Sequence, residues 1–336
     1  MTVLVVIPCL NEVANISRVA NQFISDKAVE KIVIADGGST DGTLEILTDL
    51  KEKSSKVDIL HNPKKIQSAG VNAAVKALDK TYNWLLRVDA HCAYPDEYAT
   101  TLLEAALEHK ADAVVVPMRT IGKSGFQIAA ATAQNSVIGT GGSAHRSSSS
   151  GQWVDHGHHA LMKLDLFEAI GGYCENMPCN EDAELDHRLT QAGGKIWLEP
   201  RATIDYFPRK SPKRLWIQYF KYGIGRACNV QRHKMQPRLR QLVPLLVPIA
   251  AILALFTPIH WIFSFPFLAW LGLCLGCGIL IGLKKKRSMA MFSGVAAAIM
   301  HFAWASGFFW QILTRPHGVS PQYGFKPRLT TQFSKS

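Results

Sequence analysis

Acidic residues are absent from the C-terminal part of this chain: residues 206–336 contain no aspartate and no glutamate. All 26 acidic residues lie in residues 1–205, whereas the acid-free part carries 18 of the 37 lysines and arginines. A nucleic-acid-binding protein would display such charges on a soluble face, but here they flank long apolar runs, so we expect no nucleic-acid partner. The pattern favours an anionic lipid membrane as the partner.

The chain also lacks a cysteine framework and the features of a secretory signal. Its seven cysteines have no framework spacing, and the Cys274-x-x-Cys277 pair lies inside an apolar segment. Ordinary buried thiols are therefore expected, as in proteins of a reducing compartment. The first residues include neither a basic region nor a long apolar region, so residues 3–7 are interpreted as a buried strand rather than as a signal peptide.

Three apolar stretches lie in the acid-free part. Residues 259–283 and 288–313 contain no charged residue and, at about 1.5 Å per residue, exceed a hydrocarbon core of roughly 30 Å. Residues 242–258 are shorter and contain three prolines. The basic run 284–287 is expected in the cytoplasm, which requires an even number of crossings between a cytoplasmic domain and this run. We therefore expect three crossings over 242–313, with the basic tail 314–336 on the far side.

A basic and aromatic segment, residues 208–241, connects the acidic part to the apolar stretches. It mixes tryptophan, tyrosine and phenylalanine with lysine and arginine. One interpretation is an amphipathic helix that lies at the membrane interface. The alternative is a soluble helix that packs on the preceding domain.

Strand and helix patterns alternate across residues 1–207. Short apolar runs are followed by segments with helical spacing, which predicts an α/β domain with a mostly parallel sheet and helices on both faces. A helix is expected over 43–53 and another over 181–192. The main expected strands are 3–7, 31–36, 57–60, 84–89 and 113–117.

Three acidic clusters in this domain are Asp36, Asp89 and the pair Glu181-Asp182. The first two follow predicted strands, and the pair begins a predicted helix. Carboxylates at the carboxyl ends of successive strands converge on one crevice. A nucleotide, a divalent metal ion and a catalytic base would need such a set, although each cluster alone is also typical of a turn or a helix cap.

Asp89 and His91 are two positions apart, which places both side chains on the same side of an extended segment. They are a candidate pair of ligands for Mn²⁺ or Mg²⁺, and the carboxylate with the imidazole suits manganese somewhat better. A strand-end aspartate bonded to a turn, with an incidental histidine, is the alternative. The run His156-Gly157-His158-His159 has no cysteine or acid at matching spacing, which favours a pocket-lining role over zinc.

Five motifs occur in order along the chain: VVIPCLNE (5–12), VIADGGSTDGT (33–43), LLRVDAH (85–91), GGY (171–173) and NEDAELDHRLTQAGGKIW (180–197). Together they resemble the inverting family 2 glycosyltransferases, over roughly residues 1–207. The downstream segment 218–233, followed by apolar stretches, is similar to bacterial succinoglycan-type exopolysaccharide glycosyltransferases. The resemblance implies the nucleotide-diphosphosugar transferase fold (GT-A, Rossmann-like), with a mixed sheet of about seven strands.

The matching positions imply a role for each candidate residue. Pro8 and Glu12 would line the nucleoside pocket, and Asp36 would hold the uracil edge. Asp89 would contact the ribose or a metal-bound water, and His91 would contact the metal itself.

Asp182 would be the catalytic base, with Glu181 beside it. The family triplet is usually Asp-x-Asp, so His91 is a departure that bears on the identity of the metal. The Gln-x-x-Arg-Trp motif of processive synthases is absent, which favours transfer of a single sugar. Basic candidates for binding an acceptor diphosphate are Arg209, Lys210 and Arg226.

These features predict a membrane-bound enzyme that moves one sugar from a UDP-sugar, UDP-glucose by the resemblance, to a polyprenyl-diphosphate-linked sugar. The expected location is the bacterial inner membrane, multi-pass, with a cytoplasmic catalytic domain and other polysaccharide-assembly proteins as partners. Two alternatives are a polyprenyl-phosphate sugar synthase and a non-catalytic membrane scaffold.

Overall fold

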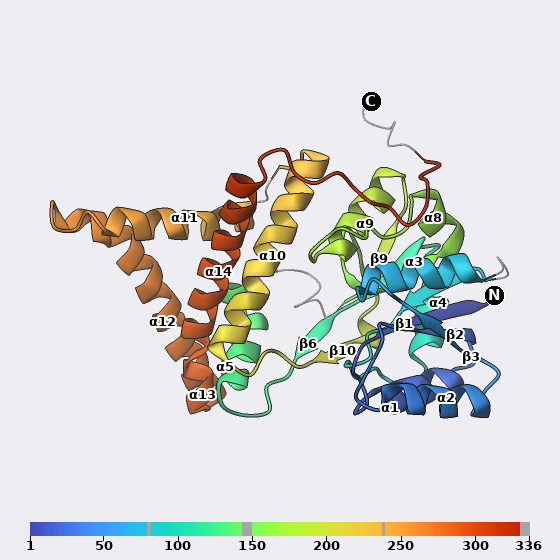
Figure 1. Ribbon diagram of the computed structural model, residues 1–336. Coiled ribbons are helices and arrows are strands. Elements are labelled where there is room, and N and C mark those ends of the chain that lie inside the picture. Colours follow the sequence, from blue (N-terminus) through green and yellow to red (C-terminus); the bar gives the residue numbers. More distant parts are fainter. Residues whose placement is uncertain (79–81, 143–149, 237–238, 330–336) are drawn as a thin grey trace.

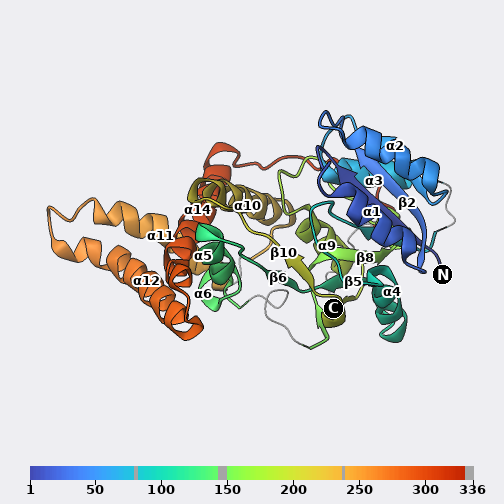
Figure 2. The same ribbon diagram turned by 90° about the horizontal axis from the view of Figure 1, so that it is seen from below.

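The computed structural model describes residues 1–78, 82–142, 150–236 and 239–329. A sheet domain and a group of C-terminal helices lie side by side, and α11 and α12 extend farthest from the sheet (Figures 1 and 2). The expected order, an α/β domain followed by apolar helices, is confirmed.

The sheet domain is built on an eight-stranded mixed sheet with the order β3-β2-β1-β4-β8-β5-β9-β7. The first four strands along the chain are parallel neighbours. β8 lies antiparallel between β4 and β5, and β7 is antiparallel to β9 at the edge. The strands are β1 (Val3–Cys9), β2 (Val29–Asp36), β3 (Val57–His61), β4 (Trp84–Arg87), β5 (Ala113–Val116), β7 (Gln152–Val154), β8 (His158–Lys163) and β9 (Ile196–Leu198).

Helices cover both faces of this sheet, as the apolar strands predict. In β1, Val3 and Val5 point to the face that holds α1, α2 and α4, whereas Leu4 and Val6 point to the face that holds α3, α8 and α9. The helices are α1 (Ile16–Ser25), α2 (Thr43–Lys53), α3 (Gln67–Ala77), α4 (Tyr98–Glu108), α8 (Leu164–Ala169) and α9 (Glu181–Gln191).

The predicted strands and helices of residues 1–117 agree with the structure to within a few residues, but residues 118–163 contain elements that the pattern does not predict. Here the chain forms β6 (Met118–Thr120), α5 (Gly125–Gln134) and α6 (Val137–Thr140) before β7 and β8. β6 pairs in parallel with β10 (Ile204–Tyr206) in a separate small sheet. These pairings join residues far apart in the sequence, so local periodicity does not reveal them.

Two C-terminal segments, Trp261–Lys285 and Ser288–Thr314, are long and apolar enough to cross a membrane. The expected third crossing at 242–258 is not supported: the helix there has 16 residues, about 24 Å, and contains two prolines. The C-terminal elements are α10 (Pro212–His233), α11 (Leu239–Ala254), η2 (Trp261–Ser264), α12 (Phe265–Lys285), α13 (Ser288–Met291) and α14 (Ser293–Thr314).

The basic helix α10 packs along α14, and the two helices run in the same direction (Figure 1). The contact is close because of two glycines. A Cβ on Gly223 would lie 1.9 Å from the Trp304 carbonyl oxygen, and one on Gly307 would lie 2.0 Å from the Phe220 carbonyl oxygen. No side chain separates the two backbones there.

After α14 the chain returns across α9 and α8 (Figure 1). Tyr323 forms a β-bridge with Cys174, and the Phe325 amide donates to the Gly171 carbonyl over 2.9 Å. The Phe325 ring also packs edge-on against Phe167. The expectation of a tail on the far side of the membrane is therefore wrong for the described residues 315–329, which pack on the sheet domain.

Candidate active site

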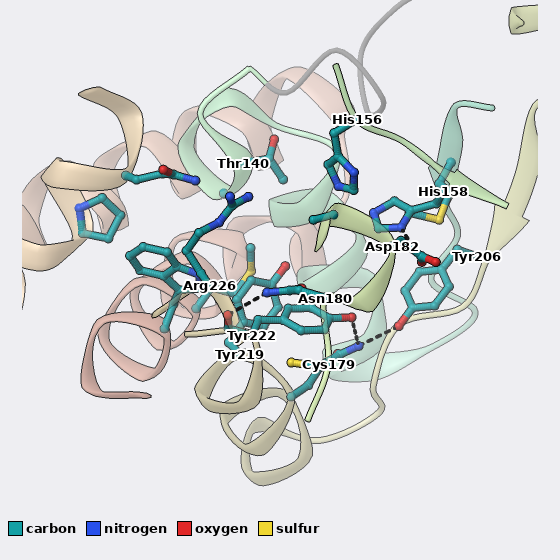
Figure 3. Close-up of a pocket in the computed structure, with 18 of the residues that line it drawn as sticks. Thr140, His156, His158, Cys179, Asn180, Asp182, Tyr206, Tyr219, Tyr222 and Arg226 are labelled. Atoms are coloured by element: carbon teal, nitrogen blue, oxygen red, sulfur yellow. Dashed lines mark hydrogen bonds and ion pairs between the residues drawn. The ribbon is translucent and has the colours of Figure 1, made fainter. Parts of the chain in front are cut away.

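A cavity of about 940 Å³ lies between the sheet domain and the C-terminal helices (Figure 3). One part of its wall is polar and charged: Arg87, Asp89, His91, Glu181 and Asp182. Another part consists of apolar side chains from α11, α12 and α14: Val243, Pro244, Trp270, Leu273 and Trp304. A single space therefore joins a carboxylate cluster to an apolar helical wall.

Arg87, the last residue of β4, lies at the centre of the charged part and is 5% exposed. Its Nη1 atom lies 2.5 Å from Asp182 Oδ1 and 3.1 Å from Glu181 Oε1, and its Nη2 atom lies 3.6 Å from Asp89 Oδ1. Burial by itself lowers the pKa of Arg87, but the surrounding carboxylates, Asp182 foremost, raise it well above its ordinary value. The guanidinium thus remains charged and holds acids from two separate motifs together.

Asp182 has two further neighbours. The Tyr173 hydroxyl donates to Asp182 Oδ1 over 3.0 Å, and His158 Nδ1 lies 3.4 Å from Asp182 Oδ2 (Figure 3). Burial and the nearby Asp182 raise the pKa of Tyr173 well above its ordinary value, so the phenol keeps its proton. These contacts fix the orientation of the Asp182 carboxylate beside the cavity.

Glu181 and Asp182 occupy the first turn of α9, as predicted, but neither caps the helix. The N-cap residue is Asn180, in a left-handed conformation with φ 59°, and no side chain accepts a cap hydrogen bond. Burial raises the pKa of Glu181, although the Arg87 guanidinium opposes this shift. A carboxylate with a raised pKa is better suited to accept a proton near neutral pH.

The histidine run contributes to the same cavity. His156 and His158 line it, and His156 Nδ1 lies 2.9 Å from Asp186 Oδ2. The Gly157 amide donates to the same Asp186 oxygen over 3.0 Å. A Cβ on Gly157 would lie 2.3 Å from a Val115 methyl, so the close backbone approach there is to β5.

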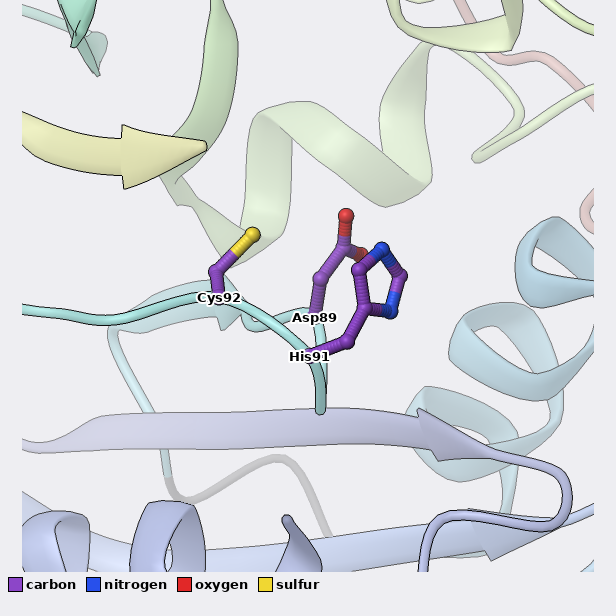
Figure 4. Close-up of side chains that lie close together, drawn as sticks. All are labelled: Asp89, His91 and Cys92. Carbon is purple, nitrogen blue, oxygen red and sulfur yellow. The ribbon is translucent and has the colours of Figure 1, made fainter. Parts of the chain in front are cut away.

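Asp89, His91 and Cys92 place their potential ligand atoms within 4.8 Å of one another (Figure 4). The carboxylate and the imidazole fit a Mn²⁺ or Mg²⁺ ion that takes its other ligands from a nucleotide diphosphate. Burial, together with Asp89, raises the pKa of Cys92 to about 12. The protonated thiol does not fit a hard cation, so Asp89 and His91 are the two fitting ligands of this group.

Pro8, Glu12 and Asp36, which are expected to bind the nucleoside, are not part of this cavity wall and lie at the ends of β1 and β2 or just after β1. Asp36, 2% exposed, accepts hydrogen bonds from the amides of Gly38 and Ser39 over 2.7 and 3.0 Å, so its carboxylate holds its own turn. Pro8 is buried in β1, whereas Glu12 Oε1 lies 3.4 Å from His91 Nδ1. Glu12 therefore connects the first loop to the candidate metal ligands.

The three basic candidates are not equivalent. Arg209 and Arg226 line the cavity, and Arg226 extends from α10 toward it in Figure 3. Lys210 is exposed and is not part of the cavity wall. Of these three candidates, Arg209 and Arg226 are thus placed to meet an anionic group inside the cavity, and Lys210 is not.

Sequence analysis does not single out Arg87 or Tyr173, and it places His158 in a pocket-lining run without connecting it to Asp182. One signal was available for Arg87: it is the only charged residue in the otherwise apolar strand Trp84–Arg87. A buried charge requires a partner, which could have pointed to the acidic clusters. No local signal distinguishes Tyr173 or His158, because their contacts with Asp182 depend on how α9 packs against β8 and the preceding loop.

Comparisons with known proteins agree with this geometry. The family model for glycosyl transferase family 2 matches residues 4–171. The chain is 46% identical over 312 residues to the succinoglycan biosynthesis protein ExoA of Rhizobium meliloti (strain 1021), covering 92% of this chain and 94% of that protein. It is 24% identical over 241 residues to a dolichyl N-acetyl-alpha-D-glucosaminyl phosphate 3-beta-D-2,3-diacetamido-2,3-dideoxy-beta-D-glucuronosyltransferase of Methanococcus voltae, covering 68% and 74% of the two chains.

Among solved structures, the fold is similar to that of the mannosyltransferase PcManGT from Pyrobaculum calidifontis in complex with GDP-Man and Mn²⁺. The TM-score is 0.58 at 16% identity, and the match covers 89% of this chain and 86% of that one. This likeness shows the GT-A fold. The match to the family model, together with the identity to the Rhizobium meliloti protein over nearly the whole chain, shows that this chain belongs to glycosyl transferase family 2.

Proposed function

We propose that this glycosyltransferase moves one sugar from a UDP-sugar to a sugar carried on a polyprenyl diphosphate, with inversion at the anomeric carbon. The observation that carries the proposal is the cavity, whose wall includes both the Asp182 carboxylate and apolar side chains of α11, α12 and α14. The sugar end of a lipid-linked acceptor suits the polar part of the wall with Asp182, and its polyprenyl chain suits the apolar part.

In the proposed reaction Asp182 takes the proton from an acceptor hydroxyl, and the hydroxyl oxygen attacks the anomeric carbon of the donor opposite the departing UDP. Arg87 and Tyr173 hold the carboxylate in place. Asp89 and His91 would hold a Mn²⁺ or Mg²⁺ ion, which when bound supplies positive charge for the diphosphate leaving group. The acceptor diphosphate would lie near Arg209 and Arg226.

Two relatives support parts of this assignment. The Rhizobium meliloti protein acts in succinoglycan biosynthesis by its name, and the Methanococcus voltae enzyme is named for a dolichyl-phosphate-linked sugar. Polysaccharide assembly on a lipid carrier is therefore the setting that we propose. Membrane association in a bacterial inner membrane, with the sheet domain cytoplasmic, follows from the same assignment.

The test is UDP release by the purified full-length protein in detergent, with manganese or with EDTA, across a panel of UDP-sugars. Each donor is offered with polyprenyl-diphosphate-galactose, with polyprenyl phosphate or without a lipid. We expect release that requires one donor, the sugar-bearing lipid and the metal. Release with bare polyprenyl phosphate would instead assign a polyprenyl-phosphate sugar synthase.

A matched pair of variants separates catalysis from folding in this assay. Asp182→Asn removes the proposed base, whereas Asp49→Asn changes an exposed aspartate of α2 whose carboxylate lies 2.7 Å from Lys53 Nζ. We expect release to be lost in the first variant and kept in the second. Equal release by both would overturn the assignment of the base, and no release by the wild-type protein under any pairing would favour the scaffold.

A further inference from the structure

The two apolar segments that could span a membrane differ in how they contact the rest of the protein. The segment Ser288–Thr314, which contains α14, is covered by other helices, and 44% of its most apolar part is buried. The segment Trp261–Lys285, which contains α12, is largely uncovered, with 17% of its most apolar part buried. The two segments therefore need not have the same relation to a bilayer, although both are long and apolar enough to cross one.

Both ends of α14 contact the sheet domain or an element joined to it. At its start, Ala296 and Ala297 pack with Ala129 and Ala133 of α5. At its end, the Gln311 amide donates to Gln231 of α10 over 3.2 Å, and the following residues 315–329 cross α9 and α8. A helix that crossed the bilayer would carry one of its ends about 30 Å away from this domain.

The helix that accompanies α14 is also unsuited to hydrocarbon. α10 lies directly against it at Gly223 and Gly307, so lipid around α14 would also surround α10. Lys221 is exposed near the middle of α10, and Arg226 lies one turn further on. Charged side chains at such a depth are costly, which argues that this helix pair stays outside the hydrocarbon core.

α11 and α12 have the opposite character. Residues 241–283 contain no aspartate, glutamate, lysine or arginine. The two helices project together away from the sheet domain, with α14 between them and the sheet, in both ribbon views (Figures 1 and 2). Around their junction the exposed apolar residues are Leu255 (76%), Phe256 (48%), Ile259 (74%), Trp261 (65%) and Ile262 (54%).

We propose that α11 and α12 form a re-entrant hairpin: they enter the membrane from the side of the sheet domain and return to the same side, while α14 lies outside the hydrocarbon core as a wall of the cavity. With 16 and 21 residues, the helices reach about 24 and 31 Å, enough to bring the junction deep into a core of roughly 30 Å. The proposal concerns membrane contact and does not depend on the donor or the acceptor.

The hairpin also accounts for the side of the membrane on which the basic run Lys284–Arg287 lies. Lys284–Arg287 forms the C-terminal end of α12 and the two residues after it, is exposed, and adjoins α13, which packs on α5. In the hairpin this run lies on the domain's side, in accord with the positive-inside rule for a cytoplasmic domain. If α12 and α14 were both spans, the run would lie on the opposite side and α13 would be separated from α5.

The first test uses the wild-type full-length protein in sealed membrane vesicles of both orientations, treated with a membrane-impermeant amine reagent and analysed by mass spectrometry. Lys51 and Lys53 of α2, 52% and 71% exposed, report the domain's side. We expect Lys284–Lys286 to react in the same orientation as these two. The proposal would be overturned if Lys284–Lys286 reacted in the opposite orientation to Lys51 and Lys53, or if they were protected in both orientations. Recovery of the protein outside the membrane fraction would also overturn it.

A second test examines the depth of the junction. Ile259→Asp places a charge at the proposed tip, and Leu107→Asp places one on α4, where the side chain is 47% exposed on the sheet domain. We expect the first variant to lower the share of protein that sediments with membranes by roughly tenfold or more, and the second to leave it unchanged. An unchanged share for Ile259→Asp would contradict burial of the tip in lipid.

Discussion

Two glutamates at the start of α9 lie in opposite electrostatic environments. Glu181, the first residue of the helix, borders the cavity, shares Arg87 with Asp182 and Asp89, and has a raised pKa. Glu184, three residues later, is fully buried among several donors, and its pKa is lowered to about 2. Its partners are Arg188 at 2.7 Å, His233 at 3.0 Å and the Tyr323 hydroxyl at 3.4 Å.

The difference shows how one helix can serve both chemistry and stability. Burial alone would raise the pKa of both carboxylates, but only Glu184 has enough donors of its own to reverse that shift. Glu184 also joins α9, α10 and the returning C-terminal segment. We therefore expect substitutions at Glu181 and Asp182 to affect the reaction and substitutions at Glu184 to affect folding.

The largest effect is expected for Asp182→Asn. Loss of the proposed base should lower the rate of sugar transfer by about 10²- to 10⁴-fold, because general base catalysis contributes that much. UDP release measures the rate, and calorimetry with UDP measures nucleotide binding. We expect nucleotide binding to persist. A variant that transfers sugar at the wild-type rate would show that Asp182 is not needed for the reaction, and the proposed difference in role between Asp182 and Glu184 would be lost.

Glu184→Gln should act on stability instead. The neutral side chain would leave Arg188 buried without its partner, so the free energy of unfolding should fall by about 3 kcal/mol at neutral pH. Denaturant unfolding in detergent measures this change, with Glu108→Gln, at a 63% exposed site, as the control. An equal effect of the two substitutions would contradict the role of the Glu184 network.

The pH dependence of unfolding sharpens the same comparison. Since the pKa of Glu184 is about 2 in the folded protein and ordinarily 4.5, its stabilising contribution is complete above about pH 4.5 and is lost as the pH falls towards 2. The difference in the free energy of unfolding between wild type and Glu184→Gln should therefore shrink over this interval. A difference that stayed constant from pH 6 to pH 3 would show that the shift is absent.

The smallest effect is expected at the exposed end of the C-terminal segment. Arg328, 66% exposed, lies 3.3 Å from Glu168, and exposed ion pairs contribute little. Arg328→Ala should therefore change the free energy of unfolding by less than about 1 kcal/mol, measured as for Glu184→Gln. A larger loss would mean that this exposed pair, and not the buried Glu184 network, holds the segment on the domain.

Part of the site follows from local sequence. Asp89 and His91 come from one motif and Asp182 from another, and the structure places all three along one cavity, since strand ends and helix starts meet at the same edge of the parallel strands. Asp36 does not line that cavity, because the Gly38 and Ser39 amides bind its carboxylate locally. An aspartate at the end of a strand looks the same in the sequence whether it lines a cavity, as Asp89 does, or binds the amides of its own turn, as Asp36 does.

The amino-acid sequence by itself determined the alternation of strands and helices over residues 1–117, the acidic and basic halves and the apolar helices, because each depends on periodicity or composition along the chain. Tertiary structure alone decided that Arg87 gathers the acids, that β8 is antiparallel, and that residues 315–329 return to the sheet domain. Those outcomes depend on contacts between residues far apart in the chain. Such a contact is stabilised by the apolar surface that it buries and by the partners that it gives to buried charges, and no local pattern records either.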